Sequence, residues 1–334
     1  MASLPLLPDV EQPRLIGIAR LAQEGEHLRD GHNIEYFTLP VRSLLNRCTS
    51  ARMPFTWTIN PYRGCEFACK YCYARYTHEF MEMRDGVDFE RKIYVKEHAA
   101  DLLRQELRHV KSGEQIALGT ATDPYQPAER HHEITRAILE EMSRHRGLDI
   151  GIVSKSNLVV RDIELLQRIS EYNRLFVNLT VTTTNVDLAR ILEPRAPRPD
   201  LRLEAVNRLV RSGIHAGVIC APVVPGITDS PKDLDHLVQA TASVGGEYIY
   251  ANPLFLKPCS AAVFLPFLEA QFPQLVERYR HHFGGNGFLP PSYGKRLSEL
   301  MAKLRKKHNI GDTYRRYSRR SHPLPQEEEQ MKLF

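Results

Sequence analysis

Three cysteines stand close together in the stretch NPYRGCEFACKYCYAR, which begins at residue 60. They are Cys65, Cys69 and Cys72, in the spacing C-x3-C-x2-C. Cysteine thiolates hold iron–sulfur clusters, usually with four cysteines for a cubane. Three protein ligands leave one iron open, which is how a catalytic metal site differs from a structural one. The spacing therefore predicts a [4Fe-4S] cluster on these three metal ligands. A zinc site completed by a distant ligand and a chance group of buried cysteines are the alternatives.

Polar residues that could bind a cofactor follow two of the apolar runs. Thr122 and Asp123 lie in GTATDPYQPAE, where an ordinary turn before a helix is the alternative interpretation. Lys155 closes the run IVSK, and a lysine there can pair with a carboxylate as a point charge. A solvated lysine at the end of a strand is the alternative.

Two further candidates lie later in the chain. Thr182 ends the run LFVNLTVT and could contact a ligand; the alternative is that threonine stands there only because it favours strands. Arg195 in LEPRAP can donate two parallel hydrogen bonds to a ligand's carboxylate, or it can pair with Glu193 of the same segment.

Six short apolar runs are predicted to be the strands that position these residues. They cover residues 55–60, 115–120, 149–155, 175–182, 215–221 and 248–255. Amphipathic helical patterns lie between them, over 97–110, 134–145, 162–172, 200–213 and 230–246. This alternation predicts an α/β fold with a parallel sheet, either an open barrel or a doubly wound sheet. In both folds the chemistry gathers at the carboxyl ends of the strands.

The two ends of the chain differ from its middle. Residues 1–50 are predicted to be an N-terminal extension in which GEHLRDGHN is a loop, and residues 51–290 to be the main domain. Residues 291–334 are predicted to form a basic helix and tail, in which Tyr314 and Tyr317 accompany many arginines. With a net charge of +5, this region could contact nucleic-acid phosphates and stack bases, although a solvated basic face is the alternative.

The beginning of the sequence has no targeting pattern. MASLPLLPDVEQP lacks a basic start and a sustained apolar run, and no run in the chain is long enough to span a bilayer. We therefore expect a cytoplasmic protein with no membrane partner. In a reducing compartment, clustered thiols bind metal or perform redox chemistry.

The cysteine spacing, with Tyr71 before the last cysteine, resembles the signature of the radical S-adenosylmethionine (SAM) superfamily. Residues from about 40 to 265 resemble its spore photoproduct lyase-like branch, also labelled DNA repair photolyase-related. The phrases that carry this likeness include HEFMEMRDGVDFERKIYVK, LGTATDPYQPAE and LEPRAPRPDLRLEAVNRL. The resemblance implies a partial (β/α)6 barrel with N- and C-terminal extensions, in agreement with the six predicted strands.

The resemblance also implies cofactors and a partner. The open iron of the cluster would bind SAM, and an external electron donor of flavodoxin or ferredoxin type would supply an electron. SAM would then be cleaved, and the resulting 5′-deoxyadenosyl radical would abstract a hydrogen atom.

Residue roles follow from the same resemblance. Tyr71 is expected against the adenine of SAM, Lys155 at its carboxylate, and Thr182 at its ribose or carboxylate. Thr122 and Asp123 occupy the place of the superfamily's glycine-rich segment near the SAM amino group. Tyr73 is the candidate catalytic residue, as a relay of hydrogen atoms, and aromatic packing is the alternative for it.

We therefore predict a radical SAM enzyme of lyase or oxidoreductase type, with a nucleic acid as candidate substrate. The alternatives are a radical SAM enzyme that modifies a peptide or small metabolite, and a non-catalytic metal-binding module for nucleic acids. The positions of Lys155 and Asp123 favour an enzyme, because a binding module needs no SAM pocket. Residues 119–123 hold no cysteine, whereas the lyase of the branch has a hydrogen-donating cysteine there.

Overall fold

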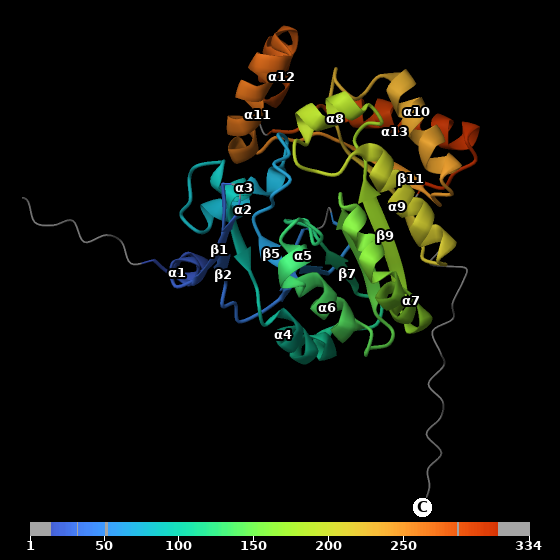
Figure 1. Cartoon of the computed structure of the whole chain (residues 1–334). Coiled ribbons are helices and arrows are strands. Elements are labelled where there is room, and N and C mark those ends of the chain that lie inside the picture. Colours follow the sequence, from blue (N-terminus) through green and yellow to red (C-terminus); the bar gives the residue numbers. More distant parts are fainter. Residues whose placement is uncertain (1–14, 32, 51–52, 286, 313–334) are drawn as a thin grey trace, which may run out of the picture.

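A seven-stranded sheet forms the centre of the computed structural model, which describes residues 15–31, 33–50, 53–285 and 287–312 (Figure 1). Six strands run parallel and in chain order: β4 (Trp57–Ile59), β7 (Gln115–Leu118), β8 (Asp149–Ser154), β9 (Arg174–Thr180), β10 (Ala216–Val223) and β11 (Ile249–Pro253). They coincide with the six predicted strands. Their order does not reverse, as it would in a doubly wound sheet, so the sheet is a partial barrel. β3 (Leu45–Arg47) pairs antiparallel with β4 at one edge, and no pairing within the described ranges joins it to β11 at the other.

Helices connect the parallel strands and cover the outside of the sheet. The strands β7 and β9 are buried almost throughout, as is typical of a parallel sheet covered by helices. The longer helices agree with the predicted amphipathic patterns, and α7 and α9 pack against β9. The connecting helices are α4 (Ala99–Glu106) with η2 (Leu107–His109), α5 (Glu129–His132), α6 (Ile134–Met142), η3 (Asn157–Asp162), α7 (Ile163–Tyr172), α8 (Val186–Leu192), α9 (Pro199–Arg211) and α10 (Pro231–Ser243).

A second, four-stranded sheet lies beside the barrel in the order β1–β2–β6–β5. Its strands are β1 (His27–Gly31), β2 (Ile34–Thr38), β5 (Tyr62–Arg63) and β6 (Lys92–Val95). The predicted loop GEHLRDGHN is therefore wrong over residues 27–31, which form an edge strand paired with β2. Because β1 is an edge strand with no buried residue, its sequence shows no apolar alternation to reveal it. Short helices accompany this sheet: α1 (Gly17–Gln23), η1 (Tyr73–Arg75), α2 (Tyr76–Glu79) and α3 (Asp88–Arg91).

The C-terminal helices are α11 (Pro258–Gln271), η4 (Pro273–Leu275), α12 (Val276–Phe283) and α13 (Pro291–Lys307). The predicted basic helix is α13, which buries Leu297, Met301 and Leu304. It is fastened to α10, because Lys307 and His308 contact Asp235 at 2.6 and 2.7 Å. The predicted arginine-rich tail with Tyr314 and Tyr317 lies outside the described residues. No helix of the described ranges combines the length and apolar character needed to cross a membrane.

Candidate cluster and cofactor site

The cysteine loop follows β5 and is held in one backbone conformation. Gly64 has a φ of +84°, and a Cβ placed on it would lie 2.6 Å from the carbonyl oxygen of Lys92. Only glycine fits this position without displacing backbone. The Cys65 N–H donates to the Phe89 carbonyl at 2.9 Å, and the Cys72 N–H donates to the Cys69 carbonyl at 3.2 Å. The loop is therefore a fixed scaffold for its thiols.

Two polar side chains that sequence reasoning missed brace this loop. Arg75, 2% exposed, donates to the Cys69 carbonyl at 3.1 Å and forms a 2.7 Å ion pair with Glu90. Gln126 accepts from the Glu66 N–H at 3.0 Å and donates to the Gly64 carbonyl at 3.1 Å. Neither residue carries a sequence signal, because only the folded chain shows which polar groups are buried against the loop.

The three thiols suit a metal cluster by their chemistry. None of the six cysteines is in a disulfide. Burial raises the pKa of each of the three, to about 12 for Cys69, and the charge of Asp123 adds to the effect at Cys65. Thiolates in such surroundings need the positive charge of a metal. Within the described ranges, no three His, Cys, Asp or Glu side chains converge on a single ion. A cubane does not require such convergence, because each thiolate binds its own iron.

Thr122 and Asp123 lie beside the loop and link it to the next strand. The Thr122 hydroxyl donates to the Gly64 carbonyl at 2.6 Å. The Asp123 carboxylate accepts from the Lys155 N–H and from the Ser154 hydroxyl, both at 2.7 Å. These two predicted residues therefore fix the ends of β7 and β8 relative to the cysteines.

Lys155 directly follows β8 and lies close to Tyr71 of the cysteine loop. Its Nζ lies 5.7 Å from the centroid of the Tyr71 ring. Burial lowers the pKa of Lys155, but the charges of Cys69 and Glu193 outweigh it and leave the pKa above its usual value. In the part of the chain that the structure describes, no carboxylate lies within ion-pair distance of this ammonium group. A half-buried cation with no carboxylate at ion-pair distance is suited to a ligand's carboxylate.

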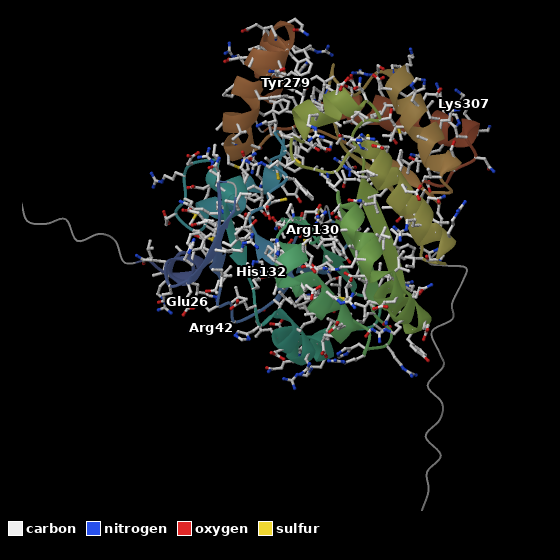
Figure 2. The ribbon with its side chains drawn as sticks, in the orientation of Figure 1. Glu26, Arg42, Arg130, His132, Tyr279 and Lys307 are labelled. Atoms are coloured by element: carbon white, nitrogen blue, oxygen red, sulfur yellow. The ribbon has the colours of Figure 1, made fainter. Side chains whose placement is uncertain are left out.

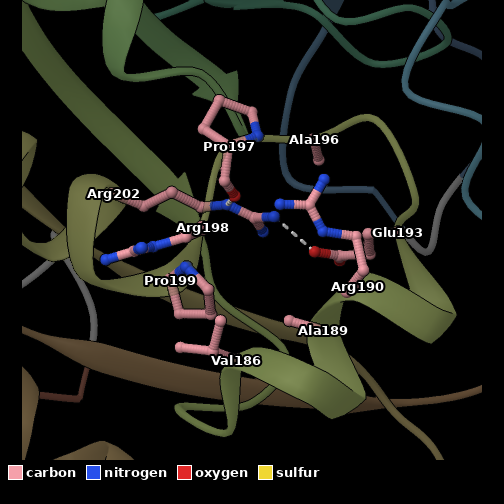
Figure 3. A pocket seen from close by; sticks show the side chains of 9 residues that line it. All are labelled: Val186, Ala189, Arg190, Glu193, Ala196, Pro197, Arg198, Pro199 and Arg202. Atoms are coloured by element: carbon pink, nitrogen blue, oxygen red, sulfur yellow. Dashed lines mark hydrogen bonds and ion pairs between the residues drawn. The ribbon is translucent and has the colours of Figure 1, made fainter.

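Glu193 connects the predicted residues Tyr71 and Thr182, and it was missed as a site residue. Its carboxylate accepts from the Tyr71 hydroxyl and from the Thr182 hydroxyl, the latter at 3.2 Å. Its ion-pair partner is Arg202 at 2.5 Å, with both side chains 1% exposed, so the alternative pairing with Arg195 is not found. Figure 3 shows this ion pair among the residues that line a small pocket between α8 and the start of α9. Burial raises the pKa of Glu193, but Arg202 and Lys155 outweigh it and lower the pKa overall.

The other two predicted residues lie elsewhere around the loop. Arg195 is exposed, and its N–H donates to the Phe67 carbonyl at 3.3 Å. Burial raises the pKa of Glu66, and the charge of Arg195 is one of the influences that oppose this. The Tyr73 hydroxyl donates to the Thr120 carbonyl, and its ring centroid lies 5.2 Å from that of Phe255. The structure thus brings Cys65, Cys69, Cys72, Tyr71, Tyr73, Thr122, Asp123, Lys155 and Thr182 to the carboxyl ends of the strands, and the backbone of Arg195 lies beside the same loop, at Phe67.

Comparison with known proteins defines the class to which this site belongs. Residues 59–238 match the family model of the radical SAM superfamily. Because this match covers more than half of the sequence, the chain belongs to the radical SAM superfamily. Membership implies a [4Fe-4S] cluster and SAM as cofactors, and it confirms the family predicted from the cysteine spacing.

Proteins of similar sequence occur in Mycobacterium tuberculosis and in a Pseudomonas phage. An uncharacterised protein of Mycobacterium tuberculosis is 34% identical over 284 residues, which cover 84% of this chain and 83% of that protein. A protein of Pseudomonas phage M6, named radical SAM Nalpha-GlyT isomerase, is 26% identical over 244 residues, 71% of this chain and 46% of that protein.

Two solved structures share the fold. A spore photoproduct lyase complexed with dinucleoside spore photoproduct is similar with a TM-score of 0.61 at 16% identity, covering 83% of this chain and 80% of that one. Streptococcus suis SuiB bound to precursor peptide SuiA is similar with a TM-score of 0.50 at 12% identity, covering 76% of this chain and 47% of that one.

Proposed function

We propose that Cys65, Cys69 and Cys72 hold the cluster and that Lys155 binds the carboxylate of SAM. The observation that carries this proposal is the Lys155 ammonium group, which lies beside the cysteine loop without a carboxylate partner among the described residues. Lysine serves such sites as a point charge. When bound, the cluster and SAM supply the ability to abstract a hydrogen atom from a substrate.

The chain's own residues give this chemistry its geometry. Glu193 holds the Tyr71 hydroxyl, so that the Tyr71 ring stays beneath Lys155 as a face for the adenine or for the carboxylate region of SAM. Thr182 shares Glu193 with Tyr71 and lies within reach of the same ligand. Thr122 and Asp123 hold the ends of β7 and β8 in place beside the cysteine loop. Tyr73, between Thr120 and Phe255, is the proposed relay of hydrogen atoms.

We further propose a nucleic acid as the substrate. The support is the exposed basic face of α13, which includes Lys295, Arg296, Lys303 and Lys306. Lysine and arginine side chains that neutralise phosphates release counterions and so drive binding. The dinucleoside bound to the structurally similar spore photoproduct lyase supports the same class of substrate.

The experiment for the substrate is a salt titration of binding to single-stranded DNA, double-stranded DNA and RNA. If α13 contacts about four phosphates, log affinity should fall with log salt at a slope of roughly −3 to −4. The α13 variant Arg296→Glu/Lys303→Glu should flatten this slope. The matched control Arg168→Glu/Arg211→Glu, on the exposed faces of α7 and α9, should keep it. Absence of binding to all three at low salt would overturn this half of the proposal and favour a peptide or metabolite.

A further inference from the structure

Three aromatic rings, named here the aromatic row, lead from the cysteine loop to the surface. The ring centroid of Phe255 lies 5.2 Å from that of Tyr73 and 5.5 Å from that of Phe288. The rings of Phe255 and Phe288 are stacked, with an angle of 15° between their planes. Tyr73 directly follows Cys72 in the chain, and Phe288 is 46% exposed. The row therefore begins beside a proposed cluster ligand and ends in solvent.

Backbone contacts fix the outer end of the aromatic row. Phe255 and Phe288 form an antiparallel β-bridge, and the Leu256 N–H donates to the Gly287 carbonyl at 2.8 Å. Gly287 has a φ of +77°, and a Cβ placed on it would overlap the carbonyl oxygen of Leu256. Only glycine allows the two segments to approach so closely. Phe288 is therefore an exposed ring on a backbone that is held in place.

Ring contacts in the C-terminal helices include pairs that belong to the core. Tyr279 of α12, labelled in Figure 2, is 1% exposed, and its ring stacks with that of Phe283 at 5.3 Å. Phe288 differs, because nearly half of its surface stays in solvent. A single exposed apolar side chain is ordinary, but this one stacks on a ring that contacts Tyr73, the proposed relay of hydrogen atoms.

The aromatic row lies at the same end of the sheet as the candidate cofactor site. Phe255 follows the end of β11 by two residues, and Lys155 directly follows β8. Both strands belong to the parallel sheet, so the two residues lie at its carboxyl end. Ligands of α/β folds bind at this end. A ligand on Phe288 therefore lies at the same end of the sheet as the proposed SAM site.

A lysine stands beside the aromatic row. The backbone nitrogen of Lys257 lies 3.8 Å from the position that a Cβ on Gly287 would take. Its Nζ lies 3.8 Å from the centroid of the Tyr76 ring, a distance typical of a cation–π contact. In the part of the chain that the structure describes, the lysines with a carboxylate at ion-pair distance are Lys92 and Lys307. The ammonium group of Lys257 is therefore available to an anion.

The aromatic row is also continuous with the basic helix. α13 begins at Pro291, three residues after Phe288, so at most about 10 Å of chain separates this ring from the helix. Lys295 and Arg296 are exposed in the second turn of α13. A strand whose phosphates contact α13 can therefore place one of its bases on Phe288.

We propose that Phe288 is a stacking platform for an unpaired base of a nucleic acid and that Lys257 contacts a neighbouring phosphate. The inference rests on the proposed function, because it states how the proposed nucleic acid is held. Bases stack on aromatic side chains whatever their sequence, while cations follow the phosphates. Inside a duplex, neighbouring bases cover both faces of a base, so this platform requires a single strand or an extruded base. An aromatic side chain of a peptide is the less suitable occupant, because it brings no phosphate to Lys257 and α13.

The test measures binding of three fluorescent probes by anisotropy. The probes are an oligothymidylate of about 12 nucleotides, a strand of the same length with abasic sites throughout, and a duplex of that length. The abasic strand carries phosphates without bases, so it reports the charge contacts alone. At about 0.5 M salt, which weakens phosphate contacts, the parent should bind the oligothymidylate more tightly than the abasic strand or the duplex.

The ring is tested by Phe288→Leu, which should bind the oligothymidylate about fivefold to a hundredfold more weakly at this salt concentration. Its affinity for the abasic strand should stay that of the parent, and Phe288→Trp, which keeps a ring, should retain the affinity for the oligothymidylate. The matched control is Tyr172→Leu. Tyr172 is 40% exposed and has the guanidinium carbon of Arg146 4.1 Å from its ring centroid, but it precedes β9 at the amino end of the sheet. This control should bind all three probes as the parent does.

The charge is tested separately by Lys257→Gln. Loss of one phosphate contact should flatten the plot of log affinity against log salt by about 0.7 for the oligothymidylate. The preference for the oligothymidylate over the abasic strand at high salt should remain, because it comes from the ring. An unchanged slope would overturn the role of Lys257.

The outcomes separate failure of this inference from failure of the proposed function. If the parent binds the probes and Phe288→Leu binds the oligothymidylate as tightly at high salt, the inference fails while the nucleic-acid proposal stands. The inference also fails if Phe288→Leu weakens binding of the abasic strand or the duplex as much as binding of the oligothymidylate. If the parent binds none of the probes at low salt, the nucleic-acid half of the proposed function fails, and this inference fails with it.

Discussion

At the scale of single residues, the buried pair of Glu193 and Arg202 connects the cysteine loop to the barrel. Removing two charges from water is costly unless their remaining hydrogen bonds are satisfied. Tyr71 and Thr182 donate to Glu193, while Arg202 also donates to the carbonyls of Thr180 and Pro197 at 3.0 and 2.7 Å. The satisfied pair holds Tyr71 in place between two of the cysteines.

The pair predicts an unequal effect of single and double substitutions. Arg202→Met leaves the Glu193 charge buried without a partner and should lower the free energy of unfolding by about 3–5 kcal/mol. The double variant Glu193→Leu/Arg202→Met removes that charge and should recover much of the loss. Urea denaturation of the metal-free protein measures both. If the double variant is as unstable as the single one, the buried charge is not the cause.

A second buried charge, Lys96, belongs to the connection that follows β6. It is 5% exposed, and its Nζ donates to the Asn60 carbonyl at 2.7 Å. Burial, and then the charge of Arg63, lowers the pKa of Lys96 to about 7, while Glu106 acts in the opposite direction. The folded protein therefore releases this proton far more readily than the unfolded chain does.

This shift predicts stability that rises with pH. Between about pH 7 and 10 the unfolded chain holds a proton on Lys96 that the folded protein has lost, so Lys96 contributes a slope of up to about 1.4 kcal/mol per pH unit. Lys96→Met should remove this part of the slope and stabilise the protein most at neutral pH, where the buried charge is most unfavourable. Unfolding midpoints across this range, for parent and variant, provide the measurement. If the unfolding midpoints of the parent and of Lys96→Met change with pH in parallel, the pKa of Lys96 is not lowered by folding.

At the scale of elements, the conformation of the cysteine loop depends on Gly64. Its Cβ would meet the Lys92 carbonyl at 2.6 Å and the Phe89 carbonyl at 2.9 Å. Gly113 has the same φ of +84° but nothing within 4 Å of a Cβ. The two glycines therefore share backbone strain and differ in steric contact.

Gly64→Ala should displace the loop from β6 and prevent three cysteines from holding a cluster together. Gly113→Ala carries only the strain of a positive φ, about 1 kcal/mol, and should keep full iron content. Iron and sulfide analysis after anaerobic reconstitution compares the two, with circular dichroism as a control for folding. Full iron content in Gly64→Ala would contradict the assigned role of this contact.

The elements also show which features a sequence can reveal. The six parallel strands were predictable because apolar β-branched runs alternate with amphipathic helices, and the three cysteines because their spacing is local. Glu193 and Arg75 were not recognised as parts of the site. Glu193 contacts Tyr71 across 122 positions, and the fold alone selects such a partner. Arg195 shows the limit of local reasoning: Glu193, its neighbour in the segment, pairs with Arg202 instead.

At the scale of the whole molecule, the cysteine loop lies at the carboxyl ends of the parallel strands. Lys155 follows β8 at this end of the sheet, with its Nζ 5.7 Å from the centroid of the Tyr71 ring. The basic helix α13 is a second feature, fastened to α10 at Asp235. The proposed cofactor site and the proposed nucleic-acid face are therefore carried by different elements.

The most direct test of this account is anaerobic reconstitution followed by SAM cleavage with dithionite. The parent should bind about four irons with matching sulfide and convert SAM to 5′-deoxyadenosine and methionine. Lys155→Ala should keep the cluster but bind SAM more weakly by roughly 1.5–3 kcal/mol, the value of one charge-assisted contact, whereas the exposed Lys111→Ala should behave as the parent. Stoichiometric zinc without iron or sulfide, or a Lys155→Ala variant that binds SAM as tightly as the parent, would contradict the account.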